Sequence, residues 1–239
     1  MATPLSFREI AESMSGAPRR VLAIDAALAA CSAAVLVDGG VVAHRLEAMA
    51  RGHAERLLPM VRETMAKAGL GFDALDLIAV TVGPGHFTGL RVGLAAAQGL
   101  ALAVGRPLAG VTTLEAIAAA APAGATPLVV ALESKRADLY LQVFVGGRPF
   151  GVPAALTPEA FAATKLPPGA LALAGDGAAR LEPVLAAAGR TIRRVGPDAP
   201  DAATVARLAA GRHGTSAALA AAPLYLRPPD VTLPKASPR

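Results

Sequence analysis

Apolar positions along the chain gather in short runs that are separated by glycines and charged residues. Three such runs stand close together near the start: Val21–Asp25, which ends in an acid, Ser32–Val37 and Val41–Leu46. Short apolar runs between turn residues are typical of β-strands. Asp38-Gly39-Gly40 separates the second run from the third and indicates a tight hairpin. We therefore expect three neighbouring strands, the first two joined by the small-residue turn Ala26–Ala30.

The second half of the chain repeats this pattern. The apolar run Leu128–Leu132 is followed by the acid Glu133, the polar turn Ser134–Asp138 and a second run, Leu139–Val145, that ends at Gly146-Gly147. Both halves thus have a strand, an acid and a hairpin in the same order. Repetition at this scale predicts two copies of one supersecondary unit.

Each half continues with a strand, a glycine turn and a helix. Leu77–Val82 precedes a helix expected over Leu90–Val104, and Leu171–Ala174 precedes one expected over Ala178–Ala188. This layout resembles the actin, sugar-kinase and Hsp70 superfamily, in which two lobes face each other across a cleft and the first hairpin of each lobe grips nucleotide phosphates. We therefore predict an α/β protein of actin-like fold, with two tandem RNase H-like lobes whose mixed sheets are flanked by helices.

The predicted lobes occupy residues 19–112 and 113–227. Residues 1–18 show no strong hydrophobic period, and residues 228–239 are rich in proline, so they are predicted to be a disordered extension and a disordered tail. Met14 is a plausible alternative start within the extension.

An amphipathic helix is predicted over His53–Ala68. Leu57, Val61 and Met65 recur in it at four-residue intervals, and Leu58 lies beside them, which gives one apolar stripe. A proline inside this stretch, at position 59, either kinks the helix or marks its start.

The helix expected over Leu90–Val104 carries small residues at the same four-residue spacing. Either stripe could simply cover its own sheet, which is the commoner role of such stripes. The alternative interpretation is that one face of the helix pair stays free to complete a four-helix bundle with a partner. The candidate interface residues are Leu57, Leu58, Val61, Met65, Ala95, Gly99 and Ala103.

Composition and charge narrow the function classes. A single cysteine excludes an intrachain disulfide, which fits a reducing compartment such as the cytoplasm. The net charge is +5, but the arginines are scattered except in Arg190–Arg194, and aromatic residues make up only 3% of the chain. Because stacking aromatics are not interleaved with the cations, binding of nucleic acid by the chain on its own is not supported.

The apolar stretch after Arg19-Arg20 imitates a lipoprotein signal, with Cys31 in the place of the modified cysteine. Asp25 in its middle would cost about 2.5–3.5 kcal/mol in a membrane-inserted helix. We therefore interpret the stretch as strands and Cys31 as a buried, inert thiol. No other stretch, Val92–Val104 included, reaches the ~18–20 apolar residues of a membrane span, so no membrane association is expected.

The most specific string in the chain is Gly83-Pro84-Gly85-His86-Phe87-Thr88-Gly89-Leu90-Arg91-Val92-Gly93. Thr88 is predicted to cap the following helix, whose exposed first-turn amides form a natural anion site. Arg91 is equally consistent with contact to an anion or partner and with a structural salt bridge, and His86 is interpreted as a variable turn residue rather than a base. The candidate contact residues of the loop are Gly83, Pro84, Gly85, Phe87, Thr88, Gly89 and Arg91.

Two further strings accompany this loop: His53-Ala54-Glu55-Arg56-Leu57-Leu58-Pro59 before it and Leu224-Tyr225-Leu226-Arg227 near the end. Together the three strings resemble the TsaB (YeaZ) family, over about Val21 to Arg227. The first half of the chain carries the more specific part of this resemblance.

The resemblance implies a non-catalytic dimerisation or scaffold subunit that binds and activates TsaD, the enzyme that makes threonylcarbamoyladenosine beside the tRNA anticodon. The implied partners are a TsaD-like paralogue, a TsaE-like ATPase, a second copy of the chain when it is alone, and tRNA only through the complex. ATP and Mg²⁺ would be used by the complex, with no cofactor bound by the isolated chain. The implied location is the cytoplasm.

Several positions depart from what an active relative would carry. TsaD holds a metal through paired histidines, and Thr113 and Ile117 stand here where those ligands would be. Ala26-Ala27 replace the hydroxyl residues that hold phosphate in the superfamily, so Asp25 and Glu133 are interpreted as a vestigial nucleotide site. The group is also called a glycoprotease family, but no peptidase motif is present in the sequence.

Two readings of the acids and histidines remain open. Asp25 could orient a metal-bound water, or, as we favour, tie its turn together as a structural acid. His53 and Glu55 could form a catalytic pair, or simply occupy the first turn of a helix. The alternative function is accordingly an independent actin-fold, ATP-dependent kinase or transferase.

Overall fold

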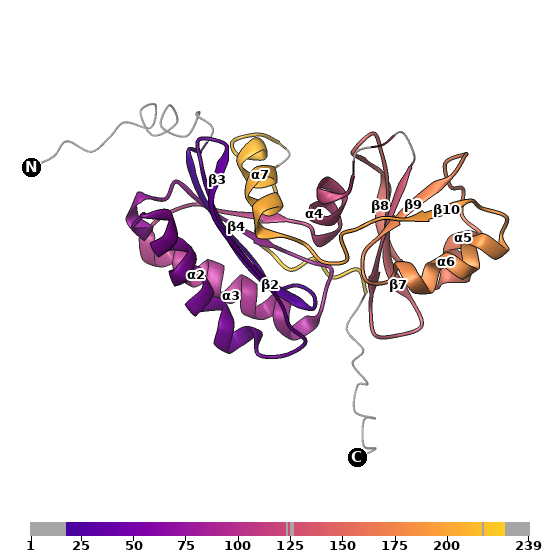
Figure 1. Cartoon of the computed structure of the whole chain (residues 1–239), viewed down its shortest axis with the longest axis horizontal. Helices are drawn as coiled ribbons and strands as arrows, with labels where there is room; N and C mark the ends of the chain where they lie inside the picture. The colour runs from indigo at the N-terminus through magenta and orange to yellow at the C-terminus, as the bar shows by residue number, and fades with distance from the viewer. Residues whose placement is uncertain (1–17, 123, 125–126, 217, 228–239) are drawn as a thin grey trace, which may run out of the picture.

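The two predicted lobes are present and lie side by side. The computed structural model of the protein describes residues 18–122, 124, 127–216 and 218–227 (Figure 1). The predicted extension, apart from Pro18, and the predicted tail lie outside the described residues, as does the alternative start at Met14.

The first lobe is built on a five-stranded sheet in the order β3-β2-β1-β4-β5. β1 pairs antiparallel with β2 and parallel with β4, so the sheet is mixed, as predicted. Side chains of β1 alternate between its faces: Leu22 and Ile24 join one buried cluster, and Val21 and Ala23 join the other. The strands are β1 (Arg20–Asp25), β2 (Ala30–Val37), β3 (Gly40–Ala48), β4 (Leu77–Thr81) and β5 (Leu108–Val111).

The second lobe repeats this topology. Its sheet has the order β10-β9-β6-β7-β8, in which β6 pairs antiparallel with β7 and parallel with β9. If the strands are numbered one to five within each lobe, both sheets have the order 3-2-1-4-5, counted from the hairpin edge. This shared order confirms the predicted duplication and the actin-like fold. The strands are β6 (Leu128–Glu133), β7 (Leu139–Val145), β8 (Arg148–Leu156), β9 (Leu171–Ala174) and β10 (Ile192–Arg194).

Helices cover the faces of both sheets. In the first lobe α2 (His53–Ala68) and α3 (Phe87–Val104) pack on one face, and α7 (Ala202–Arg212) packs on the other. A short 3₁₀ turn, η1 (Phe72–Ala74), follows α2. The remaining helices are α4 (Thr113–Ala120), α5 (Pro158–Ala162) and α6 (Ala178–Ala187).

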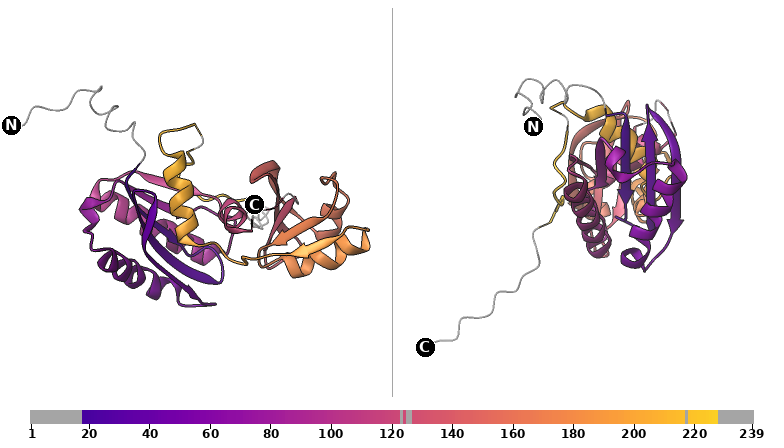
Figure 2. Two further views of the ribbon diagram at one scale, coloured as in Figure 1. Left: turned by 45° about the horizontal axis from the view of Figure 1, so that its top comes forward. Right: turned by 90° about the vertical axis from the view of Figure 1, so that its left-hand side faces the viewer.

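The course of α7 differs from the prediction that residues 113–227 all belong to the second lobe. Although it follows the second sheet in the sequence, α7 buries Val205, Ala206 and Ala209 against the first sheet (Figure 2). The backbone N–H of Ala202 donates to the hydroxyl of Ser32 on β2 at 2.9 Å, which fixes the start of α7 there. The first lobe is therefore assembled from two separate parts of the chain.

The starts of α2 and α3 compare differently with the predictions. α2 starts at His53, as predicted, so the alternative that Pro59 marks its start is wrong. α3 starts at Phe87 rather than Leu90, and its N-cap is His86. Thr88 therefore lies inside the first turn, and the prediction that it caps the helix is wrong.

The stretch that imitates a lipoprotein signal forms β1 and β2, and Cys31 is fully buried in β2. Burial raises the pKa of this thiol to about 11, which keeps it protonated and unreactive. By length and composition alone, α3 is apolar enough to cross a membrane, contrary to the sequence estimate, and 33% of it is buried in the fold. The buried part is the side that packs on β4.

Candidate functional site

The apolar stripe of α2 lies against the sheet of its own lobe. Leu57, Val61 and Met65 are all buried in the core between α2, α3 and the first sheet. Their proposed role as partner contacts is therefore wrong, because a fully buried side chain has no surface to offer. Leu58, the fourth residue of that set, points outward with 46% of its surface exposed.

The small residues of α3 lie on its outer side. Ala95, Gly99 and Ala103 are all exposed, and a Cβ added at Gly99 would meet no atom within 4 Å. Leu102, beside them, is 86% exposed. From Val92 to the end of the helix the only polar side chain is Gln98. An apolar helix face of this length, open to solvent, is typical of an interaction surface.

The glycine-rich loop that precedes α3 packs directly on the turn between β1 and β2. A Cβ on Gly85 would lie 2.4 Å from the carbonyl oxygen of Ala27, and one on Gly89 would lie 2.1 Å from that of Ala26. The backbone N–H of His86 donates to the Ala27 carbonyl at 2.7 Å. The loop therefore lies directly against the small-residue turn formed by Ala26 and Ala27.

Asp25 lies beneath that turn and is fully buried. One of its carboxylate oxygens, Oδ1, accepts hydrogen bonds from the hydroxyl of Thr81 at 2.6 Å and from the N–H of Ala27 at 3.1 Å. Burial raises its pKa to about 7. Asp25 therefore ties the turn to β4, and its geometry fits the structural role better than the orientation of a metal-bound water.

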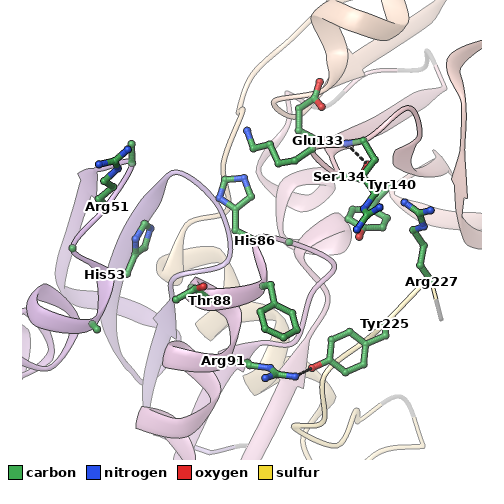
Figure 3. Close-up of a pocket in the computed structure, with 18 of the residues that line it drawn as sticks. Arg51, His53, His86, Thr88, Arg91, Glu133, Ser134, Tyr140, Tyr225 and Arg227 are labelled. Carbon is green, nitrogen blue, oxygen red and sulfur yellow. Dashed lines mark hydrogen bonds between the residues drawn. The ribbon is translucent and has the colours of Figure 1, made fainter. Parts of the chain in front are cut away.

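A cleft with a volume of about 1310 Å³ lies between the lobes (Figure 3). Its walls are the first turns of α2 and α3, the turn between β6 and β7, and the segment that follows α7. The three strings that carry the family resemblance are far apart in the sequence, yet all three line this cleft. Their lining residues are His53 and Glu55 of the first string, Gly85 to Gly89 and Arg91 of the second, and Tyr225 and Arg227 of the third.

The segment from Leu224 to Arg227 runs from one lobe to the other. The N–H of Leu224 donates to the carbonyl of Val82 at 2.7 Å in the first lobe. The guanidinium of Arg227 pairs with Asp138 at 3.0 Å in the second lobe. This segment therefore holds the two walls of the cleft together.

Arg91 adopts an arrangement that the sequence analysis did not consider. Its guanidinium lies 3.7 Å from the centre of the Phe87 ring, and it reaches the hydroxyl of Tyr225 at 3.5 Å. Among the residues that the structure describes, no carboxylate pairs with it, so the salt-bridge interpretation is not supported. Its charge remains available to an anion in the cleft.

The histidines of the cleft have different environments. Nε2 of His53 lies 2.9 Å from the carbonyl oxygen of Leu28, a contact that anchors the start of α2. His86 has a buried Nε2 with no hydrogen-bond partner among the described residues. Burial, with nearby Lys135 and His53 adding to it, lowers the pKa of His86, so this ring is neutral near pH 7.

Glu133, the second acid of the predicted vestigial site, lies at the rim of the cleft. Its carboxylate forms a salt bridge at 2.8 Å with Arg180, so its charge is neutralised by a residue of its own lobe. Glu133 lines the cleft, whereas Asp25 does not.

Thr113 and Ile117, the positions at which the family resemblance implied lost metal ligands, lie in α4. Thr113 and Ile117 are fully buried there, and Ile117 packs in the cluster between α4 and the second sheet. In the part of the chain that the structure describes, no three histidine, cysteine, aspartate or glutamate side chains gather closely enough to hold a metal ion.

Comparison with known proteins adds three findings. A family model described as "TsaD: tRNA N6-adenosine threonylcarbamoyltransferase" matches residues 31–149. The curated tRNA threonylcarbamoyladenosine biosynthesis protein TsaB of Escherichia coli is 42% identical over 123 residues, or 51% of this chain, and that of Haemophilus influenzae is 39% identical over 127 residues, or 52% of this chain. The matched part of the chain spans about half the length of these curated relatives, 53% of each.

The solved structure of YeaZ from Pseudomonas aeruginosa is similar over nearly its full length. It has a TM-score of 0.74 and 31% sequence identity, and the match covers 87% of this chain and 99% of that one. The chain belongs to the TsaB (YeaZ) family. The resemblance predicted from the three sequence strings is thus confirmed.

Membership of the TsaB family does not by itself explain the cleft. The glycine loop, Tyr225 and Arg227 belong to the family strings, whereas four further residues that line the cleft do not: Arg51, Lys135, Arg136 and Tyr140. Lys135 and Arg136 lie in the polar turn from Ser134 to Asp138, which is their only signal in the sequence, whereas Arg51 and Tyr140 belong to no predicted motif.

Proposed function

We propose that this protein is a non-catalytic subunit in tRNA threonylcarbamoyladenosine biosynthesis, and that it binds and activates a TsaD-like paralogue through the outer face of α3. The observation that carries the proposal is the exposed, almost entirely apolar side of α3, with Ala95, Gly99 and Ala103 leaving room for a second helix. Small side chains allow two helix axes to approach within about 8 Å.

The match to the TsaD family model supports this choice of partner. The matched residues, 31–149, include both α2 and α3, so a TsaD-like protein would carry an equivalent helix pair. Two related surfaces can meet about a pseudo-twofold axis, as two identical ones do in a homodimer. The chain alone would accordingly pair with a second copy, and would exchange it for the paralogue.

The remaining partners follow from the same proposal. A TsaE-like ATPase and tRNA would join the assembly, ATP and Mg²⁺ would be used by the complex rather than by this chain, and the setting would be the cytoplasm. The covered turn at Ala26-Ala27 supports the absence of a nucleotide site in this lobe. The cytoplasmic setting is consistent with the buried, protonated Cys31.

The test uses a glycine that can be changed without disturbing the fold. Gly99→Arg places a charge in the α3 face, where nothing lies within 4 Å, and Gly211→Arg on α7 is the matched control with equally open surroundings. After co-expression with the TsaD-like paralogue, size-exclusion chromatography should show pairing for the control and separate proteins for Gly99→Arg. Pairing by a folded Gly99→Arg variant would place the interface elsewhere.

The alternative function, an independent actin-fold kinase or transferase, rests on the cleft. Kinases of this fold bind nucleotide between their lobes, and a cleft of about 1310 Å³ is present here. The covered phosphate turn and the lack of hydroxyls at Ala26-Ala27 weigh against this alternative.

A further inference from the structure

The cleft between the lobes has an excess of positive charge. Five of its lining side chains are cationic: Arg51, Arg91, Lys135, Arg136 and Arg227. Two are carboxylates, Glu55 and Glu133; Glu133 is paired with Arg180, and among the cations Arg227 is paired with Asp138. A concave surface lined mostly by one sign of charge concentrates ligands of the opposite sign.

Two helix N-termini add to the positive electrostatic potential of the cleft. The first turns of α2 and α3 both line the cleft, and neither helix has a side chain that caps its first amides. The first intrahelical bonds are those of Arg56 to Gly52 and of Leu90 to His86, so the amides that precede them have no partner within their helices. Free amides and the helix dipole both favour an anion at such a position.

Aromatic rings stand beside these cations. Phe87 and Tyr225 are 59% and 54% exposed, and Tyr140 lines the opposite wall (Figure 3). Cations alternating with exposed rings are typical of surfaces that bind a nucleic-acid strand, because the cations contact phosphates and the rings stack on bases. An acidic peptide would use the charges but has no need of the rings.

We propose that this cleft binds the phosphate backbone of an RNA strand. The cleft exceeds the roughly 300–1,000 Å³ of small-molecule pockets, which suits a segment of polymer better than a single small anion. Arg51 and Lys135 approach the strand from the two lobes, and the exposed rings of Phe87 and Tyr225, which both contact Arg91, receive unstacked bases. The inference deepens the proposed function, on which it rests, by giving this subunit a direct share of the RNA contact.

The experiment measures RNA affinity as a function of salt. The full chain, alone and in complex with its TsaD-like paralogue, is titrated with a tRNA anticodon stem-loop at several salt concentrations. The cleft variant carries Arg51→Glu and Lys135→Glu, and the matched control carries Arg148→Glu and Arg193→Glu, two exposed positions of the second lobe outside the cleft. Circular dichroism checks that both variants fold.

The cleft variant should bind the RNA about ten-fold more weakly than the control, and the slope of log affinity against log salt should fall by about 2, one for each lost phosphate contact. Equal affinity and slope for the two variants would overturn the inference. Polyglutamate serves as a competitor: if it binds the cleft as tightly as the RNA does, the site takes acidic peptides and the inference is also overturned.

The two proposals fail in different ways. If the cleft variant pairs with the paralogue but retains full RNA affinity, the inference fails and the proposed function stands. If the chain does not pair with the paralogue but shows RNA binding that depends on Arg51 and Lys135, the proposed partner is wrong and the cleft site stands.

Discussion

The Cα of Gly89 faces the carbonyl oxygen of Ala26 so closely that an added Cβ would lie 2.1 Å from it. This contact sets the distance between α3 and the β1–β2 turn, and it explains why a glycine stands in the first turn of a helix. Any side chain larger than that of glycine at position 89 would collide with the backbone of the β1–β2 turn.

Gly89→Ala should therefore lower the free energy of unfolding by about 2 kcal/mol or more, since either α3 or the turn must move. Gly99→Ala is the control in the same helix, with open space around the new methyl group. It should raise the free energy of unfolding by about 0.5–1 kcal/mol through helix propensity. Urea denaturation compares the two, and equal stabilities would contradict the close contact.

Asp25 should make stability depend on pH. Its pKa is about 7 in the folded protein and 3.8 as the reference for the unfolded chain. Between these values the folded state holds a proton that the unfolded state has released, so the free energy of unfolding should fall as the pH rises from about 4 to about 7 and then level off. Asp25→Asn keeps an oxygen for Thr81 and Ala27 and cannot titrate.

Denaturation of the wild type and of Asp25→Asn across this pH range tests the point. The wild type should lose stability relative to the variant as the pH approaches 7. Parallel curves would mean that the carboxyl group is ionised throughout and that its burial is compensated in another way.

Adjacent leucines of α2 should behave differently. Leu57 is buried in the core and Leu58 is 46% exposed. Leu57→Ala should cost about 2–5 kcal/mol of stability, whereas Leu58→Ala should change it by no more than about 0.5 kcal/mol. Thermal denaturation measures both, and a large loss at Leu58 alone would reverse the assignment of the two faces.

The isolated chain should bind ATP·Mg²⁺ weakly or not at all and should not hydrolyse it. The physical reason is the cover that Gly85 and Gly89 place over the turn at Ala26-Ala27. Isothermal titration calorimetry at micromolar protein concentrations gives the answer. Tight binding at one ATP per chain would favour the kinase or transferase alternative.

Much of the fold was predictable because its signals are local. The hairpin at Asp38-Gly39-Gly40 and the start of α2 at His53 depend on neighbouring residues, and both are found as predicted. The start of α3 was missed because Gly89 weakens a helix in isolation, and the compensating contact with Ala26 comes from a distant part of the chain.

Other errors have the same origin. The period of Leu57, Val61 and Met65 shows that α2 has one apolar side, but only the packed structure shows that its own sheet covers that side. The cations of the cleft are separated in the sequence, and Arg51 and Lys135 come to one cleft only because the two lobes face each other. No local sequence pattern indicates that these two residues line the same cleft.

The return of α7 to the first sheet has a consequence for how the protein is made. During synthesis the first five strands, α2 and α3 leave the ribosome early. The sheet face that carries Val21 and Ala23 is not covered until α7, with Val205, has also been synthesised. Domains fold as units when their cores are complete. The nascent first lobe therefore keeps an apolar sheet face exposed until the second lobe and α7 have been translated.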